Sequence, residues 1–164
     1  MKQVLFFCFM LNTLLLSKCD TVDRSRFTLM GEHVYDKKTQ LTWMRCSVGS
    51  QWKEGIGCQQ MPKLMSFYEA KEVESRLKSQ WRIPTIEELE TIFLVQCEKD
   101  AINTTLFPDI KRLESFAPYW STTSVKQLPY LIYYIDFIDK NIDAHSKGFS
   151  MFLRLVKSNE SHKQ

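Results

Sequence analysis

Two helix-start signals in the middle of the chain, with strand-forming sequence on both sides, constrain the fold more than any other feature. Residues 66–69 and 85–88 are capping boxes, in which a Ser or Thr and a Glu three residues later bind the first free amides of a helix. The first predicts a helix to about residue 80, with an apolar stripe of Phe67, Ala70, Val73 and Leu77. The stripe of the second continues through Leu89, Ile92, Phe93 and Cys97. We therefore expect two capped amphipathic helices that lie back to back.

Short strands are predicted before and after these helices. Before them, residues 27–30, 33–35 and 41–45 are strand candidates, and a turn at 36–39 makes the last two a hairpin. After them, strands are predicted at 119–123, 131–138 and 149–157, with the polar stretch 139–148 as a long hairpin connection. Because helices and strands do not alternate as βαβ units, we expect an α+β fold: two short amphipathic helices packed on an antiparallel sheet.

The chain length of 164 residues fits one compact domain. Residues 1–19 have the anatomy of a signal peptide: Lys2, an apolar block at 4–16, and the small residues Ser17 and Cys19 before Asp20. The block is shorter than the roughly 20 residues that a membrane-spanning helix needs. We therefore predict a signal peptide at 1–19, a single domain at 20–157 and a polar tail at 158–164, with no membrane span.

This N-terminal segment predicts a secreted, periplasmic or cell-surface protein. We favour secretion over lipid attachment at Cys19, because Lys18 stands where a lipidation motif needs a small residue. Removing the segment takes away Lys2 and Lys18, which leaves 20 Lys and Arg against 19 Asp and Glu and lowers the formal net charge from +3 to +1. A dedicated nucleic-acid binder would be far more basic, so no nucleic-acid partner is expected.

Three cysteines belong to the predicted domain. Cys46 and Cys58 flank a polar stretch that contains three glycines, and we predict a disulfide between them worth about 3 kcal/mol. Their spacing matches no paired zinc-ligand motif, so no metal site is expected. Cys97 lies on the apolar face of the second helix, where we expect a buried, unreactive thiol. A bond from Cys97 to Cys19 would require Cys19 to survive processing.

Four segments recur in order in one bacterial family. They are residues 34–36 leading to 41–49; residues 81–85 (Trp-Arg-Ile-Pro-Thr) with Glu88 and Leu89; Phe107-Pro108 followed by 119–123 (Tyr-Trp-Ser-Thr-Thr); and residues 152–156 (Phe-Leu-Arg-Leu-Val). Over residues 27–157 the chain resembles the Lcl C-terminal domain family, named after the terminal domain of a collagen-like bacterial adhesin. The ordered set is more specific than any one motif.

The resemblance implies a C-type-lectin-like fold, and residues 82–85 are also similar to a stretch in formylglycine-generating enzymes. It does not by itself imply a function, because one fold hosts many. In the adhesin, the family domain is associated with trimerisation and with binding of sulfated glycosaminoglycans. This chain has no Gly-X-Y stalk and a predicted mature charge near zero. Both departures argue against polyanion binding.

The large residues within the shared motifs are interpreted as structural. We expect Trp43, Trp81 and Trp120 in the core rather than as sugar-stacking platforms. Pro84 precedes a helix start. Arg82 and Arg154 are each expected to pair with a carboxylate or to bind backbone carbonyls at the end of an element.

Loop cations are the candidate ligand-binding residues: Lys111, Arg112, Lys126, Lys140 and Lys147. The sequence does not show that they converge, and exposed lysines are also ordinary solvated surface. Residues 139–143 begin like a calcium loop, but Ala144 and Ser150 replace its glycine and glutamate, so ligand binding is expected to be calcium-independent.

No catalytic motif stands out, and neither cofactor nor enzymatic activity is expected. There is no Gly-x-Ser-x-Gly elbow or phosphate-binding loop, and no cysteine follows Cys97, whereas formylglycine-generating enzymes use a reactive pair near the carboxyl end. We predict an adhesin-like binding module for an extracellular glycan or surface protein, with function in the loops at 99–118 and 139–148. The alternatives are an enzyme-derived domain of the formylglycine-generating group and a structural subunit of a surface assembly, and a homo-oligomer stays open.

Overall fold

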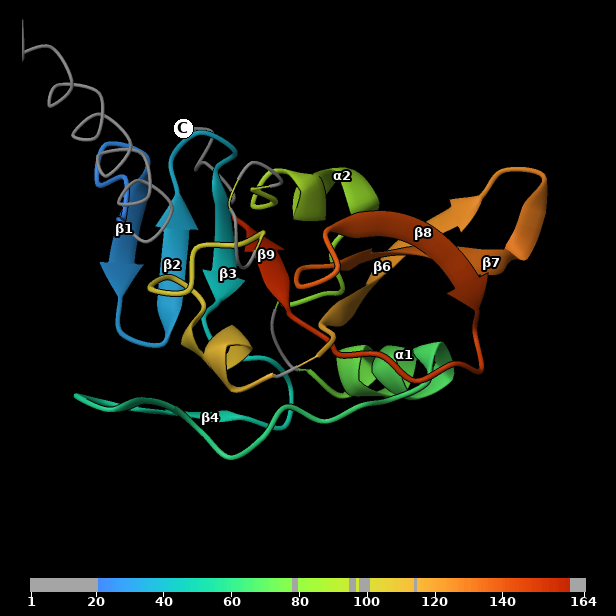
Figure 1. The fold of residues 1–164 in the computed structure, drawn as a ribbon, viewed down its shortest axis with the longest axis horizontal. Coiled ribbons are helices and arrows are strands. Elements are labelled where there is room, and N and C mark those ends of the chain that lie inside the picture. Colours follow the sequence, from blue (N-terminus) through green and yellow to red (C-terminus); the bar gives the residue numbers. More distant parts are fainter. Residues whose placement is uncertain (1–20, 78–79, 95–96, 98–100, 114, 160–164) are drawn as a thin grey trace, which may run out of the picture.

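The computed structural model describes residues 21–77, 80–94, 97, 101–113 and 115–159. The predicted signal peptide and residues 160–164 of the predicted tail lie outside these residues. Three antiparallel sheets and three short helices follow one another in an α+β arrangement (Figure 1). In chain order they are β1 (Phe27–Met30), β2 (His33–Asp36), β3 (Leu41–Met44), β4 (Gln51–Lys53), β5 (Gly57–Gln59), α1 (Phe67–Arg76), α2 (Ile86–Glu90), the 3-10 helix η1 (Pro108–Arg112), β6 (Pro118–Val125), β7 (Leu128–Asp136), β8 (Asn141–Ser146) and β9 (Val156–Ser158).

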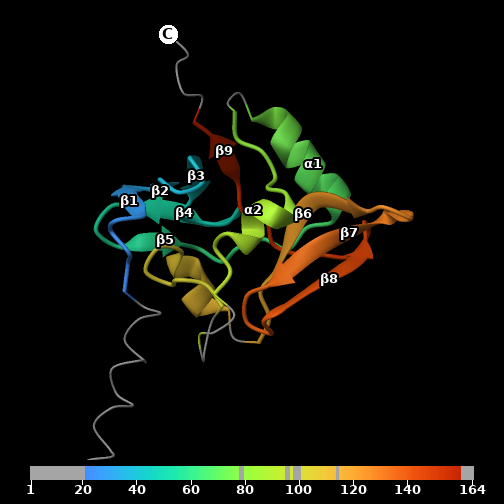
Figure 2. The same cartoon turned by 90° about the horizontal axis from the view of Figure 1, so that it is seen from above.

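The amino-terminal sheet has the order β1-β2-β3-β9, so the last strand of the chain completes the sheet that the first strand starts. The predicted hairpin is present, with Val34 opposite Trp43, and β9 places Val156 against the other side of Trp43. The second sheet, β6-β7-β8, lies beside the first in two perpendicular views (Figures 1 and 2). Strands β4 and β5 form a separate two-stranded hairpin.

The second half of strand β7 packs on both faces and separates two hydrophobic cores. Ile135 belongs to the first core, with α2 residues Ile86 and Leu89, whereas Ile132 belongs to the second, with Trp120 and Ala70 of α1. Successive side chains of a strand point to opposite faces, so the two helices cover opposite faces of one sheet. Figure 1 shows α2 above and α1 below β6–β8. The expectation that the helices lie back to back is therefore wrong.

Both helices start as predicted and end earlier. Ser66 with Glu69 and Thr85 with Glu88 form complete capping boxes. Helix α1 ends at Arg76, and α2 ends at Glu90, well before Cys97. After α2 the chain turns back, and the amide of Leu94 donates to the carbonyl of Ala101 at 2.7 Å. The start of a helix is set by its local capping residues. Its end is set here by the bond between Leu94 and Ala101, although the apolar spacing of the sequence alone predicts a longer helix.

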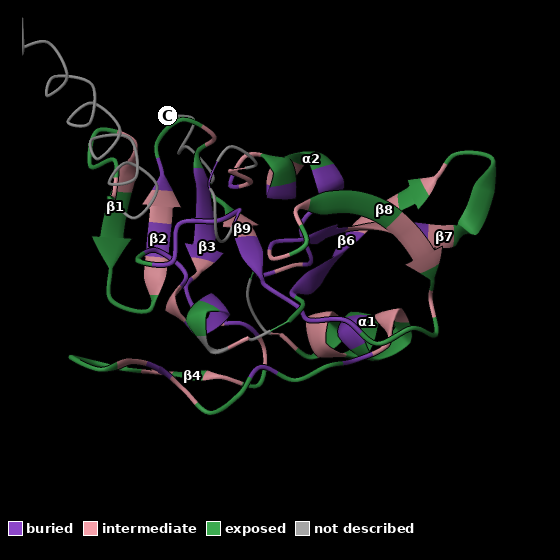
Figure 3. Cartoon of the chain, viewed as in Figure 1, coloured by how far each residue is buried: buried purple, intermediate pink, exposed green. Residues whose placement is uncertain are grey.

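The carboxyl-terminal third differs most from the prediction. The stretch 139–148, expected as a connection, contains the six-residue edge strand β8. The expected strand at 149–157 is instead a bridge between sheets: Phe152 bonds with Pro118 of β6, and Leu155 accepts from Met44 of β3. Only its end, β9, is a regular strand. The buried residues in purple follow this segment through the centre of the molecule (Figure 3).

A bidentate ion pair supports the start of α2 and predicts a pH dependence. Arg82 binds both carboxylate oxygens of Glu88 at 2.6 and 2.7 Å, and Glu88 also accepts from the amide of Thr85. Burial of Glu88 favours its neutral form, but the bonds from Arg82 and Thr85 outweigh this and lower the pKa of Glu88 below its ordinary value of 4.5. The stabilisation is thus present above about pH 4.5 and is lost as the pH falls through the lowered pKa.

We expect Glu88→Gln to reduce the free energy of unfolding by about 1 kcal/mol at pH 7, because it loses a charge-assisted pair that is only partly exposed. The difference from wild type should shrink as the pH falls through the lowered pKa of Glu88, because the carboxylate then becomes neutral like the glutamine amide. Urea denaturation at several pH values measures the difference in the free energy of unfolding. Glu87→Gln, at an exposed neighbouring position, is the control. A difference that is constant across this range would contradict the assignment.

Candidate functional site

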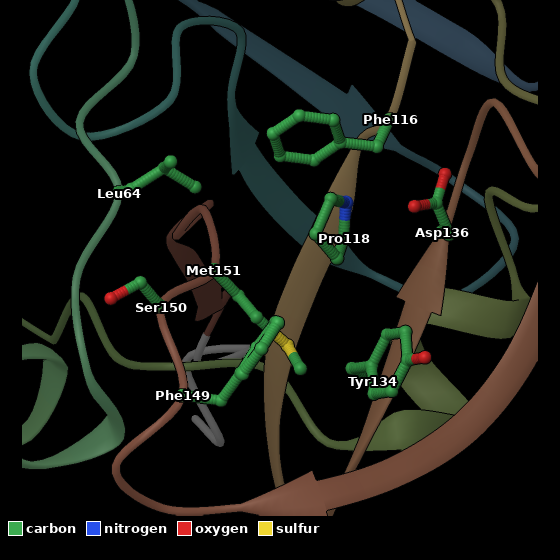
Figure 4. A pocket seen from close by; sticks show the side chains of 8 residues that line it. All are labelled: Leu64, Phe116, Pro118, Tyr134, Asp136, Phe149, Ser150 and Met151. Atoms are coloured by element: carbon green, nitrogen blue, oxygen red, sulfur yellow. The ribbon is translucent and has the colours of Figure 1, made fainter.

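An open apolar pocket of about 410 Å³ lies where the second sheet meets the segment that follows β8. Three parts of the chain build it: the start of β6, the end of β7, and the bridging segment at 149–151, with one residue from the stretch before α1 (Figure 4). The lining side chains are Leu64, Phe116, Pro118, Tyr134, Asp136, Phe149, Ser150 and Met151. The pocket thus depends on the same tertiary contacts that hold the carboxyl-terminal third in place.

Two phenylalanines that line the pocket are exposed to solvent. Phe116 is 44% exposed and Phe149 is 47% exposed, and neither ring is left unsupported. The ring of Phe116 stacks on buried Phe152 with 6.2 Å between centroids, and that of Phe149 lies 4.0 Å from the ring of His145. Each ring is held on one side by an aromatic neighbour while a large part of it stays open to solvent. Single exposed apolar side chains are common, but two that border one apolar pocket form a contiguous surface that can bind a ligand.

The pocket contains one carboxylate, that of Asp136. The side chain is almost fully buried, and its Oδ1 accepts from the amides of Ala117, Ile138 and Asp139 at 2.9 to 3.0 Å. Within the described part of the chain, Oδ2 has no hydrogen-bond partner. Three backbone bonds to one oxygen fix the carboxylate, which leaves the second oxygen available to a ligand.

The electrostatic surroundings of the pocket are acidic. The pKa of the Tyr134 hydroxyl is raised, first by burial and then by the carboxylates of Asp143, Asp136 and Asp139. Each of these charges disfavours the phenolate, so the Tyr134 side of the pocket has a negative potential. Such a potential repels anions and attracts cations.

The five basic residues predicted as ligand contacts do not line this pocket. Lys111 and Arg112 lie on η1, and Lys126 lies at the β6–β7 turn, at the far end of the molecule from η1 in two views (Figures 1 and 2). Lys140 lies in the β7–β8 turn and donates to the carbonyl of Cys97 at 2.6 Å, whereas Lys147 follows β8. They are distributed over several elements, and no single surface gathers all five.

The motif residues interpreted as structural are buried or paired. Trp43 and Trp120 are fully buried and Trp81 nearly so; Pro84 is also buried. Arg82 binds Glu88, as described above. Arg154 is completely buried against Asp109, with 2.7 Å between Nη2 and Oδ1. Aromatic core and structural ion pairs therefore account for the shared motifs.

Sequence analysis missed Phe116 and Phe149. Phe116 lies within the loop at 99–118 where function was expected, but Phe149 was assigned to the predicted strand at 149–157. The available signal was its position in the sequence: Phe149 stands between Gly148 and Ser150, and Ser150 separates it from the apolar run that starts at Met151. A lone aromatic residue in a polar loop is a candidate for exposure, whereas an unbroken run predicts core.

The predicted disulfide is present, and a second one corrects the expectation for Cys97. Cys46 and Cys58 are bonded, with their Cα atoms 5.6 Å apart. Cys97 is buried and is also disulfide-bonded, to a partner outside the described residues. The expectation of a free, unreactive thiol at Cys97 is therefore wrong.

We expect the chain from residue 19 onward, denatured without reductant, to contain no thiol that iodoacetamide alkylates, because the disulfide of Cys97 needs a cysteine outside the described residues. Non-reducing peptide mapping should recover Cys97 in a crosslinked peptide, because the structure has this residue in a disulfide. Cys46 and Cys58 bond to each other, so the sequence leaves Cys8 and Cys19, of which only Cys19 lies outside the predicted apolar block. Stoichiometric alkylation of Cys97 would contradict the assignment, and its recovery with Cys19 would exclude a lipid on Cys19.

Two further findings concern metals and membranes. Within the residues that the structure describes, no three His, Cys, Asp or Glu side chains come together as a metal site. Over the same residues, none of the helices has the length and apolar character needed to cross a bilayer.

Together these features define a disulfide-bonded α+β domain built from antiparallel sheets, with an open aromatic pocket. The family model described as Lcl C-terminal domain matches residues 32–157. The chain therefore belongs to the Lcl C-terminal domain family and is an adhesin-like surface domain. This confirms the family that the ordered motifs suggested. No curated protein and no solved structure matches the chain.

Proposed function

We propose that this protein is a secreted or surface-attached binding module with a C-type-lectin-like fold, which recognises an extracellular ligand without catalysis and without calcium. The pocket bordered by Phe116 and Phe149 is the proposed binding site. The observation that carries the proposal is that two exposed phenylalanines, at 44% and 47%, border the same apolar pocket, whereas the exposed rings of Tyr68 and Tyr130 do not line it. Family membership and the Cys46–Cys58 disulfide support an extracellular setting.

The pocket is preferred over the loop lysines because its residues converge and those lysines do not. An exposed lysine is strongly hydrated, so its exposure does not indicate a ligand. An exposed phenylalanine ring costs solvation free energy in the unbound protein, and a ligand that covers the ring recovers it. The ligands considered are a glycan and another surface protein, both of which present apolar patches to aromatic rings.

A glycan array probed with residues 19–164, which retain Cys19 and are here called the mature domain, tests this proposal. The array includes neutral and sulfated polymers and is read at two salt concentrations with and without a chelator. We expect chelator-resistant binding that Phe116→Ala and Phe149→Ala remove. Tyr130→Ala should not remove it, because Tyr130 is more exposed than either phenylalanine but does not line the pocket.

The other outcomes of the array are also informative. Salt-sensitive binding that survives both phenylalanine variants but is lost in Lys111→Ala or Lys126→Ala would move the site to the loop cations. An array without binding would exclude the glycan version and leave a protein partner or a structural role.

A further inference from the structure

The pocket offers a ligand much apolar surface and few hydrogen-bond partners. Leu64, Pro118 and Met151 add aliphatic surface to the three aromatic rings. The polar groups that line it are the Asp136 carboxylate and the hydroxyls of Tyr134 and Ser150, none of which carries a positive charge. A ligand group that fills this space must therefore tolerate an apolar wall and favour a negative potential.

These properties make two common ligand groups poorer matches for the interior of the pocket. A sulfate or carboxylate would meet Asp136, with Asp139 and Asp143 close enough to act on Tyr134, and without a cation among the lining residues to pair with it. A buried pyranose carries several hydroxyls, each of which loses free energy unless it is bonded, and the pocket provides bonding groups for only a few of them.

A primary ammonium group fits less well than a substituted one. Its three N–H donors each need an acceptor on burial, and it is strongly hydrated. A quaternary ammonium group has the same charge but no N–H donor, and its methyl groups pack on apolar walls. Aromatic rings attract such cations, and aromatic cages are a recurrent way of binding them.

We propose that the pocket bounded by Phe116, Tyr134 and Phe149 binds a quaternary ammonium group, with the Oδ2 atom of Asp136 as its counter-charge. This inference rests on the proposed function, because it specifies the ligand of the same pocket. The charge complementarity comes from a carboxylate that three backbone amides already hold in place. The aromatic contacts come from rings that are open to solvent before any ligand binds.

Choline is the probe, and 3,3-dimethyl-1-butanol is its uncharged isostere. We expect the mature domain to bind choline saturably, with at least about tenfold higher affinity than the isostere, as judged by NMR titration or calorimetry. Phe116→Ala and Phe149→Ala should each weaken choline binding about fivefold or more, whereas Tyr130→Ala should leave it unchanged. Asp136→Asn, which keeps a carbonyl-type oxygen as acceptor, should weaken it about tenfold, and thermal unfolding verifies that the variant is folded.

Variants that lack the pocket hydroxyls distinguish a quaternary ammonium ligand from a sugar. Tyr134→Phe and Ser150→Ala keep the apolar surface, so each should weaken choline binding less than Phe116→Ala does. Loss of binding in these two variants would indicate a hydroxyl-bonded ligand and would overturn the inference. Equal affinity for choline and the isostere, or no saturable binding of choline, would also overturn it.

Two sources of the group are distinguished by vesicles. Cosedimentation with phosphatidylcholine vesicles, but not with phosphatidylglycerol vesicles, would place the ammonium group on a lipid headgroup. Binding of choline without vesicle binding would indicate a soluble or polymer-linked source. If choline does not bind while the glycan array shows binding that depends on Phe116, the quaternary ammonium assignment is wrong and the proposed function is still supported.

Discussion

Asp109→Ala is expected to reduce the free energy of unfolding by about 3 to 5 kcal/mol, because it leaves the guanidinium of Arg154 buried without its counter-charge. Both side chains are fully inaccessible to solvent. Arg154 also donates to the carbonyls of Met44 and Arg45 at 2.9 and 2.7 Å, so it is held in the core and is not free to turn toward water. Burial alone would lower the pKa of Arg154, but the adjacent Asp109 carboxylate keeps this pKa above its ordinary value.

Urea denaturation measures this loss, and an exposed ion pair is the matched control. Glu72 and Arg76 lie 3.1 Å apart on the surface of α1, and Glu72→Gln should change the free energy of unfolding by no more than about 0.5 kcal/mol. A loss under about 1 kcal/mol for Asp109→Ala would mean that Arg154 finds another partner or water.

A double variant keeps the prediction testable if Asp109→Ala does not fold. Asp109→Leu with Arg154→Met removes both charges and keeps apolar volume, and such replacements are often neutral relative to the intact pair. We expect the double variant to be more stable than Asp109→Ala. Its failure to recover stability would assign the loss to the bonds with Ser47 and the backbone rather than to the unpaired charge.

This ion pair also shows what the sequence can and cannot predict. Arg154 was expected to be structural because it stands inside a strongly apolar run, and that local signal is reliable. Its partner could not be identified, since Asp109 lies on a 3-10 helix 45 residues away. The capping boxes at Ser66 and Thr85 are complete within four residues, and both were predicted correctly.

The elements that were missed depend on contacts distant in sequence. Neither face of strand β8 is strongly apolar, so its sequence gives little strand signal. Its pairing with β7 depends on the turn between them, in which Asp136 accepts from the amides of Ile138 and Asp139. The pocket has the same origin, because Phe116, Phe149 and Leu64 meet only after the bridging segment has joined both sheets. Family motifs identify the scaffold, but the exposed rings lie outside these motifs.

The Cys46–Cys58 disulfide is expected to contribute about 3 kcal/mol by the chain-entropy model, since it closes a loop with a sequence separation of 12. The loop carries β4 and β5, which have three residues each and are too short to be stable as an isolated hairpin. The double variant Cys46→Ser with Cys58→Ser should lower the urea midpoint accordingly. This comparison is cleaner than adding a reductant, which would also cleave the bond at Cys97.

The disulfide and the buried ion pair should not be independent. Ser47 follows Cys46 directly, and its amide donates to Oδ2 of Asp109 at 2.5 Å, while its hydroxyl accepts from Arg154. The bond to Cys58 therefore restrains a residue that both charged side chains bind. Because neighbouring changes couple by 0.5 to 3 kcal/mol, we expect Asp109→Ala combined with both serine substitutions to cost about 1 kcal/mol less than the sum of the separate losses. Additive losses would mean that the disulfide acts only on the unfolded chain and does not position Ser47 for the ion pair.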